Sequence, residues 1–476
     1  MLNCQYYTPN NTSQMNKILK EDKNEIENLL KSVNKLATDF IQGLDNRATS
    51  TDSEVEIDTA LASQGLGAQA TLKHFIEKFN DIIIASSGPR YWGFVTGGAT
   101  PAAIAGDWLA TVYDQNTQSI KGQGDISALI EIETIQLLLD LFNLPDDFLG
   151  GFVTGATMSN YTCLAVGRQW LGKQLGRDIA KQGVCENLKI LSATPHSSAI
   201  KSLSMLGIGS NNIIKVKTIK GNREAIDIDD LKQQIKRLAN QPFMLISSAG
   251  TVNTVDFDDF EEIAALKQDH NFWWHIDAAF GGFAVCSPQY KHFLKDWESA
   301  DSITIDCHKW LNVPYESAVY FIKDRHKMLQ IETFQNSNAP YLGDPMNDFN
   351  YLNFLPENSR RLKALPAWFT LKAYGKQGYQ DIVENCVAMT QLLAEFINNN
   401  QHFELLAPVH LNTVCFRLSD TSKSTNEFLQ RLNKRAKVFM TATVFNGDTA
   451  IRAALVNWRT NKKDVEIAID EMLSVI

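Results

Sequence analysis

Lys309 is the side chain in this 476-residue sequence with the clearest capacity for covalent chemistry. It follows an apolar segment, 302–306, with the composition of a buried strand, and His308 and Trp310 flank it. A desolvated lysine amine is nucleophilic and forms Schiff bases with carbonyl compounds. The alternative is a lysine that extends its amine from a strand end into solvent, and Lys309 alone does not decide between the two.

Asp277 ends another strongly apolar segment, 272–277. A carboxylate at such a place is costly unless it meets a cation or hydrogen-bond donors, and a protonated pyridine nitrogen would be a suitable cation. The small residues that follow Asp277 leave room for a planar ring to lie against Ala279. The alternative is a carboxylate bonded to a neighbouring loop.

Two further clusters complete the set of candidate residues. His196 follows the strand-like segment 189–193, where its ring either stacks on an aromatic group or serves the fold. The small-residue segment 150–160 (GGFVTGATMSN) leads into a helical pattern, and a helix N-terminus suits a phosphate, with Thr157 as an added donor. An ordinary turn capped by Thr or Ser is the alternative. The segment lacks the GxGxxG and GxxxxGK[ST] patterns of dinucleotide and P-loop sites.

Together the four clusters supply the groups that pyridoxal 5'-phosphate (PLP) requires. They offer a phosphate cradle at Thr157, a stacking ring at His196, an anion for the pyridine nitrogen at Asp277 and an amine for the aldehyde at Lys309. The PLP ring accepts electrons well only while its nitrogen is protonated, and a carboxylate holds it so.

These residues must be positioned by a common scaffold. The segments 189–193, 243–247, 272–277 and 302–306 are apolar and β-rich, with helix-length stretches between them, so we predict an α/β fold with a mainly parallel sheet covered on both faces. Ligands of such sheets bind outside the carboxyl ends of the strands, where the clusters lie. From about residue 366 a long helical stretch, short strands and a closing helix predict a smaller α+β domain.

The predicted domains are an N-terminal helical segment (1–86), a large cofactor-binding domain (87–365) and a small C-terminal domain (366–476). A helix is predicted over about 15–44, and its apolar stripe packs either on its own chain or on a partner subunit. The net charge of −9 argues against nucleic acid as a partner. Seven scattered cysteines favour reduced thiols over disulfides or a metal site. Without a signal peptide or membrane span, we expect a cytoplasmic protein.

The motifs HIDAAFGG (275–282) and DSITIDCHKWLN (301–312) resemble the paired motifs of the group II PLP-dependent decarboxylases, which include glutamate, aromatic-amino-acid, histidine and diaminobutyrate decarboxylases. The likeness extends to SGPRYWGFVTGG (87–98), AGTVNTVDFDD (249–259) and SRRLKAL (359–365). It implies a fold-type I PLP enzyme with a seven-stranded type of sheet, which forms a homodimer with active sites at the subunit interface.

The resemblance also implies roles for individual residues. Lys309 would carry the cofactor, Asp277 would pair with its ring nitrogen, and His196 and Ala279 would lie against its two faces. The remaining cofactor contacts would come from Ala156, Thr157, His308 and Thr251.

A mobile loop with a proton-donating tyrosine is another family feature, and Tyr341 is the candidate, with a surface tyrosine as the alternative. The sequence departs from the family in three places. GATMSN stands where GlyGly is common, Cys307 where Pro is common, and PAW (366–368) where LysLeuTrp is common.

The predicted activity is decarboxylation of an L-amino acid to its amine and CO2. An aminotransferase, a carbon–carbon lyase and an aldehyde-forming enzyme are alternatives on the same fold. A non-catalytic scaffold would be expected to lack the lysine or the aspartate, and both are present. Arg360, Arg361, Arg452 and Arg459 either bind carboxylates or form structural ion pairs.

Overall fold

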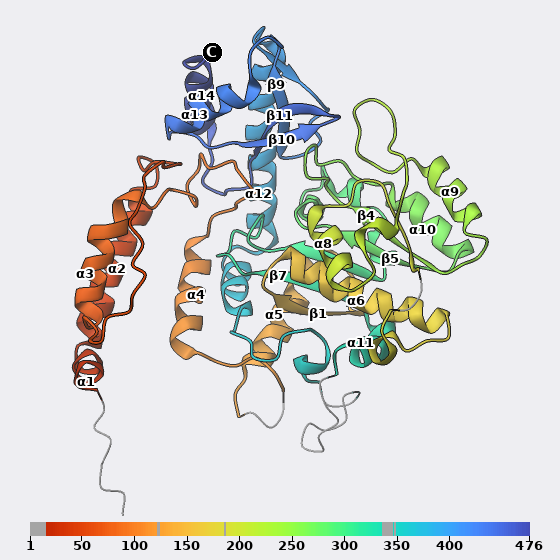
Figure 1. The fold of residues 1–476 in the computed structure, drawn as a ribbon, viewed down its shortest axis with the longest axis horizontal. Helices are drawn as coiled ribbons and strands as arrows, with labels where there is room; N and C mark the ends of the chain where they lie inside the picture. Colours follow the sequence, from red (N-terminus) through yellow and green to blue (C-terminus); the bar gives the residue numbers. More distant parts are fainter. Residues whose placement is uncertain (1–15, 121–123, 185–186, 336–345, 347–348) are drawn as a thin grey trace, which may run out of the picture.

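A computed structural model describes residues 16–120, 124–184, 187–335, 346 and 349–476. It has a large sheet domain, a smaller domain packed above it, and a pair of N-terminal helices at one flank (Figure 1). No helix in the described part of the chain is both long and apolar enough to cross a membrane.

The large domain is built on a seven-stranded sheet in the order β1-β7-β6-β5-β4-β2-β3. β7 pairs antiparallel with both β1 and β6, and the other neighbours are parallel. The predicted α/β fold and its four predicted strands are therefore confirmed. The strands are β1 (Phe148–Val153), β2 (Lys189–Ser192), β3 (Ile213–Lys215), β4 (Phe243–Ser248), β5 (Phe272–Asp277), β6 (Ser302–Asp306) and β7 (Ala318–Lys323).

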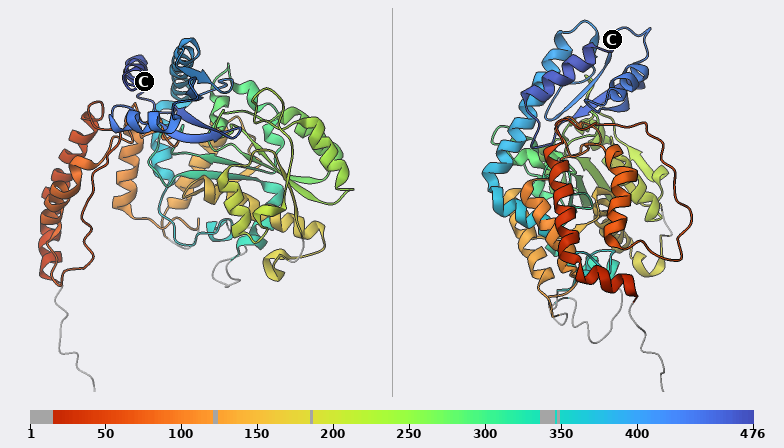
Figure 2. Two further views of the ribbon diagram at one scale, coloured as in Figure 1. Left: turned by 45° about the horizontal axis from the view of Figure 1, so that its top comes forward. Right: turned by 90° about the vertical axis from the view of Figure 1, so that its left-hand side faces the viewer.

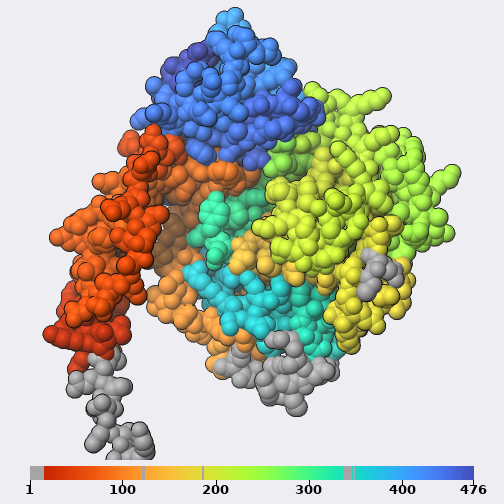
Figure 3. Space-filling view, in the orientation of Figure 1, coloured from red at the N-terminus to blue at the C-terminus, as the bar shows by residue number. Residues whose placement is uncertain are grey.

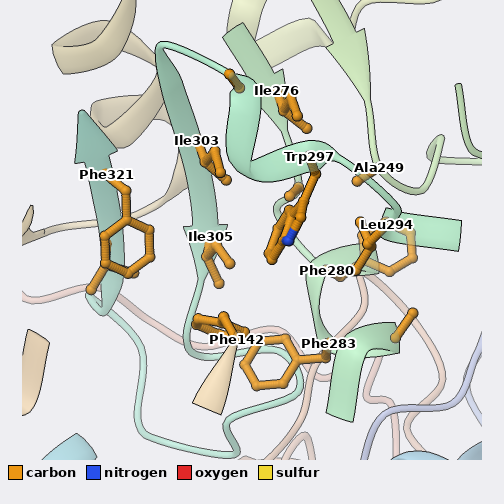
Figure 4. Close-up of a cluster of buried hydrophobic side chains, with 14 of the residues drawn as sticks. Phe142, Ala249, Ile276, Phe280, Phe283, Leu294, Trp297, Ile303, Ile305 and Phe321 are labelled. Carbon is orange, nitrogen blue, oxygen red and sulfur yellow. The ribbon is translucent and has the colours of Figure 1, made fainter. Parts of the chain in front are cut away.

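Side chains of successive strand residues enter two different cores, one on each face of the sheet. Trp273 packs with helices α6 and α8, whereas Trp274 packs with α5, α9 and α10 on the opposite face. Figure 4 shows part of this second core, with Trp297, Ile303 and Phe321 gathered between sheet and loops. The helices of the large domain are α4 (Pro101–Tyr113), α5 (Ser127–Leu141), α6 (Ala156–Gln174), α7 (Ile179–Gln182), α8 (Ser197–Met205), α9 (Ile228–Arg237), α10 (Phe260–Asp269) and α11 (Lys327–Phe334).

The small domain contains an antiparallel sheet in the order β10-β11-β9-β8 and a third core of its own. Helix α12 (Ala364–Asn399) is kinked at Gly375, whose φ of 58° is unfavourable for other residues. The boundary predicted at 365/366 falls inside this helix, and Trp92 from the large segment enters the small domain's core. The other elements are β8 (Phe403–Leu405), β9 (Thr413–Leu418), α13 (Thr425–Lys434), β10 (Thr441–Phe445), β11 (Asp448–Ala454) and α14 (Lys462–Leu473).

The N-terminal segment forms three helices, α1 (Lys17–Asn24), α2 (Ile26–Gln42) and α3 (Ala68–Phe79), none with a fully buried residue. The single helix predicted over about 15–44 is broken at Glu25, whose φ of −97° and ψ of 7° lie outside helical geometry. Figure 2 shows α2 and α3 side by side at the edge of the molecule. Short 3-10 helices complete the chain at Asn80–Ile82, Ser210–Asn212, Gly281–Cys286, Lys291–Leu294, Trp297–Ser299, Asp324–His326 and Tyr351–Asn353.

Candidate active site

The predicted site residues on β2, β5 and β6 lie at the same edge of the large sheet. β2, β4, β5 and β6 run parallel, so their carboxyl ends meet on one side. His196 comes just after β2, Asp277 is the last residue of β5, and Lys309 follows β6. The fold therefore gathers residues that are more than a hundred positions apart in the chain.

Lys309 lies in the turn after β6, with its side chain only 12% exposed. Its Nζ is 3.4 Å from Asp306 Oδ2 and 5.3 Å from the centroid of the Phe280 ring. Behind it, the Gly97 N–H donates to the His308 carbonyl, at 3.2 Å. A Cβ on Gly97 would lie 1.8 Å from the Lys309 carbonyl oxygen, so only glycine fits at this close approach.

Asp277 is buried, with 7% of its surface exposed, and it has no ion-pair partner within 4 Å among the described residues. Oδ2 accepts from Asn160 Nδ2 at 2.9 Å, and Oδ1 accepts from the Ala279 N–H at 3.2 Å. A carboxylate has about four acceptor positions, so capacity remains for another donor. A buried carboxylate of this kind fits a cationic ring nitrogen.

His196 caps the N-terminus of α8, where its Nδ1 accepts from the Ser198 N–H at 3.2 Å and lies 2.7 Å from Ser198 Oγ. The residue is exposed to solvent. Desolvation by the surrounding atoms lowers its pKa, an effect that Asp277 opposes and Lys309 and Arg452 reinforce. The imidazole is therefore neutral at pH 7 and suits stacking on a ring.

The turn before α6 begins the helix without a side-chain cap. Gly155 is the N-cap residue, and α6 starts at Ala156, so the predicted turn-to-helix junction is confirmed. The first N–H groups of an α-helix have no partner within it, and the positive end of a 19-residue helix favours an anion. Ala156 and Thr157 stand at this end, which fits a phosphate group.

The other predicted contact residues surround the same region. His308 Nδ1 lies 2.8 Å from Asp306 Oδ1, and the ring stacks on Tyr315 at 4.5 Å between centroids. Ala279 is partly exposed after the end of β5, and its carbonyl accepts from the Asp306 N–H at 2.9 Å. Tyr341 lies outside the described residues.

Thr251 is held in a polar cluster by a residue that the sequence did not single out. Its hydroxyl donates to Glu224 Oε2 at 2.6 Å, and Thr254 donates to the same oxygen at 2.8 Å. The Thr251 oxygen also accepts from the Asp256 N–H at 3.0 Å. The proton of Thr251 is thus committed to Glu224.

Asn160, Glu224 and Gly97 are the site residues that sequence reasoning missed. Asn160 sits one helical turn into α6 and contacts Asp277 from 117 positions away in the chain. Asn160 closes the segment 150–160 and Gly97 lies in the motif 87–98, both already noted, but neither residue was given a role. No local pattern pointed to Glu224.

The four arginines considered above differ in the groups that they contact. Arg360 is fully buried and pairs with Glu131 at 2.6 Å, while Arg361 pairs with Asp107 at 2.9 Å. Arg452 donates to the Val252 carbonyl at 2.9 Å, and Arg459 lies over the Trp458 ring. Arg360 and Arg361 therefore serve the fold, because their partners are carboxylates of the chain itself.

These contacts define an enzyme site that fits PLP, with a buried amine, a buried unpaired carboxylate, a neutral imidazole and an uncapped helix N-terminus around one sheet edge. The comparisons agree. Residues 56–419 match the model of the pyridoxal-dependent decarboxylase conserved domain. The chain belongs to the family of the PLP-dependent amino-acid decarboxylases, and the predicted family, cofactor and enzyme class are confirmed.

Individual relatives are similar to this chain over most of its length. An aromatic-L-amino-acid decarboxylase of Bacillus atrophaeus is 28% identical over 412 residues, covering 83% of this chain and 82% of the relative. A phenylacetaldehyde synthase of a Rosa hybrid cultivar is 25% identical over 407 residues, covering 79% and 78%. The crystal structure of Oryza sativa TDC with PLP and tryptamine has a TM-score of 0.85 at 20% identity, covering 98% and 99%, and shares the fold.

Proposed function

We propose that this enzyme uses Lys309, Asp277 and His196 to decarboxylate an L-amino acid with an uncharged, apolar or aromatic side chain. The observation that carries the proposal is the buried carboxylate of Asp277, which lacks a cationic partner among the described residues and faces the same site as Lys309. Bound PLP supplies a protonated ring that accepts the electrons released when CO2 leaves.

The chain's residues then have separate tasks. Lys309 Nζ binds the cofactor aldehyde, Asp277 holds the proton on the ring nitrogen, and His196 and Ala279 restrain the ring between them. The first N–H groups of α6, at Ala156 and Thr157, bind the phosphate with His308 beside them. Thr251 presents an oxygen but no proton to the ring, since its proton is bonded to Glu224.

Two variants, Lys309→Ala and Asp277→Ala, test the core proposal, and a third variant is the control. Lys309→Ala is expected to abolish CO2 release and to remove the cofactor absorbance near the visible edge, while Lys372→Ala, an exposed lysine on α12, retains both. Asp277→Ala is expected to weaken PLP binding and to lower kcat, because the ring nitrogen loses its anion. An unchanged cofactor spectrum in Lys309→Ala would refute the assignment of the lysine.

We infer the substrate class from the lining of a cavity of about 500 Å³ beside His308 and Tyr315. It is bounded by α2, α3, α4 and the loop at 96–99, and Phe40, Ile83 and Trp108 lie in its wall. No acidic residue, lysine or arginine is among the described residues that line it. An uncharged side chain of aromatic size fits this wall, whereas a charged one would be desolvated without a partner.

A panel of L-amino acids assayed for CO2 release tests the substrate class. Aromatic and large apolar amino acids are expected to react, and Trp108→Ala is expected to raise their KM more than it lowers kcat. Preferential turnover of glutamate or of a basic amino acid would contradict the proposal.

A second candidate function is oxidative formation of an aldehyde, which the similarity to phenylacetaldehyde synthase favours. We assign the proton delivered to Cα to Tyr341, so Tyr341→Phe is expected to slow amine formation and to divert product to aldehyde. Product analysis of the unmodified enzyme decides between the two functions. Amine and CO2 in equal amounts support decarboxylation, whereas consumption of O2 with release of aldehyde, CO2, ammonia and hydrogen peroxide in equal amounts supports the second candidate.

The proposal includes a homodimer in the cytoplasm. Large apolar side chains stand exposed on α2 and α4, with Leu30 at 52% and Val112 at 68%. Figure 3 shows the N-terminal segment, red to orange, along one side of the molecule. A second subunit would bury these side chains. Analytical ultracentrifugation should give a dimer mass that Val112→Asp shifts toward the monomer.

A further inference from the structure

A continuous chain of hydrogen bonds runs along the α6-covered face of the sheet to both proposed cofactor-contacting residues. It links Trp273, Ser302, His275 and Asn160, then branches to Asp277 and, through Ser198, to His196. We propose that Asn160 is a positioning residue that keeps Asp277 ionised and His196 neutral through this chain. The inference rests on the cofactor roles proposed above for Asp277 and His196.

The direction of the chain follows from the groups in it that can only donate or only accept. The Trp273 indole N–H can only donate, and it donates to Ser302 Oγ at 3.0 Å. The Ser302 hydroxyl proton is then free to bond to His275 Nδ1, at 2.9 Å. Asn160 Oδ1 can only accept, so His275 Nε2 carries the imidazole proton and donates to this oxygen at 2.8 Å.

The neutral form of His275 agrees with its surroundings. The ring is fully buried, and desolvation lowers its pKa to about 4 despite the nearby Asp277. His275 and Asp277 are two residues apart on β5, so both side chains point to the face covered by α6. Asn160 on α6 can therefore contact both at once.

The amide orientation of Asn160 follows from its contact with the Asp277 carboxylate. Its oxygen faces the His275 Nε2–H, and its nitrogen faces Asp277 Oδ2, which can only accept while ionised. Exchanging the two amide atoms would place oxygen against carboxylate and N–H against N–H. Both N–H groups of the amide are used, because the second donates to Ser198 Oγ at 3.0 Å.

The branch to His196 is directed in the same way. Ser198 Oγ accepts a hydrogen bond from Asn160 Nδ2. The Ser198 hydroxyl then donates to His196 Nδ1, at 2.7 Å. The Ser198 backbone N–H also donates to Nδ1, and a backbone N–H cannot accept. Nδ1 is therefore unprotonated, and His196 is neutral with its proton on Nε2.

The other charges that act on His196 come from several elements. Asp277 and Asp306 favour its protonation, whereas Lys309 and Arg452 oppose it. The charges of these groups act in opposite directions, and the hydrogen bond from Ser198 favours the neutral form of the His196 imidazole. A neutral imidazole avoids placing a second positive charge on a protonated ring, and an ionised Asp277 keeps that ring protonated.

The test compares Asn160→Ala and Asn160→Asp with Ser159→Ala. Ser159 is the preceding residue of α6, equally buried, and its hydroxyl lies 2.9 Å from Thr304 Oγ1 and 2.8 Å from the Val319 carbonyl rather than near Asp277. Two quantities are measured: the pKa of His196 in the cofactor-free protein, by NMR of 13C-labelled histidine, and the dissociation constant of PLP, by equilibrium dialysis. His196→Gln and His275→Gln assign the resonances.

In Asn160→Ala we expect the pKa of His196 to rise by about one unit and PLP to bind roughly 10- to 100-fold more weakly, the range for loss of a hydrogen bond to a charged group. Asn160→Asp keeps the size of the side chain but donates only when protonated. Its deficit in PLP binding relative to the unmodified enzyme, measured at the same pH, should therefore be largest at pH 8 and shrink towards pH 5.5.

An unchanged His196 pKa in both Asn160 variants overturns the inference, and so does PLP binding within twofold of Ser159→Ala. If all three variants bind PLP equally weakly and the pKa of His196 does not change, Asn160 has a purely structural role. This result also overturns the inference. The variant Asp277→Ala distinguishes failure of the proposed cofactor role of Asp277 from failure of the proposed positioning role of Asn160. If it leaves PLP binding unchanged, the proposed role of Asp277 fails, while the His196 titration still reports on the chain of hydrogen bonds.

Discussion

Replacing Gly97 with alanine should disable the site without unfolding the protein. The added Cβ would lie 1.8 Å from the Lys309 carbonyl oxygen and 3.0 Å from the His308 oxygen. Ordinary contact begins at 3.4 Å, so the two backbones must separate by roughly 1.6 Å. Both contacting atoms belong to backbone and cannot rotate away. The turn that carries Lys309 must therefore move.

The size of the effect follows from this displacement. A misplacement of about 1 Å in a catalytic group costs on the order of 100-fold in rate, and we expect at least that loss in kcat/KM. Overpacking costs about 1–3 kcal/mol of stability, which an enzyme of this size should tolerate. Steady-state kinetics, the PLP absorbance spectrum and circular dichroism measure the three quantities.

Gly65→Ala is the matched control, because a Cβ there meets nothing within 4 Å. It should behave as the unmodified enzyme does. A Gly97→Ala enzyme with an unchanged cofactor spectrum and a kcat/KM within twofold of this control would refute the reasoning.

Other predictions concern stability. Arg360→Ala should lower the free energy of unfolding by about 3–5 kcal/mol, because Glu131 stays buried without a partner, and Arg360→Met combined with Glu131→Leu should recover most of it in denaturant titrations. The pKa of His275 is about 4 in the folded protein against 6.5 when exposed, so its contribution is present above pH 6.5 and is lost as pH falls towards 4. The loss should reach about 3 kcal/mol, and His275→Gln should flatten that part of the pH–stability curve.

Much of the large domain could be predicted from local patterns. The four predicted strands are largely buried on both faces, so each appears as a short segment rich in apolar and β-branched or aromatic residues with a polar residue at its end. The helix predicted over 15–44 is broken at Glu25, where six consecutive polar residues, 20–25, separate Leu19 from the apolar stripe that begins at Ile26. The boundary placed at 365/366 missed that α12 spans it, because hydrophobic periodicity does not mark where one helix passes from one domain to another.

The sequence by itself determined the cofactor chemistry, because Lys309, Asp277 and His196 each follow a strand, and parallel strands bring their ends to one edge. Only the tertiary structure decided how those groups are held. Asn160 reaches Asp277 across 117 residues, Glu224 takes the proton of Thr251, and Gly97 supports the turn of Lys309. Such contacts depend on which side chains packing brings within about 3 Å, and no local pattern in a chain encodes that distance.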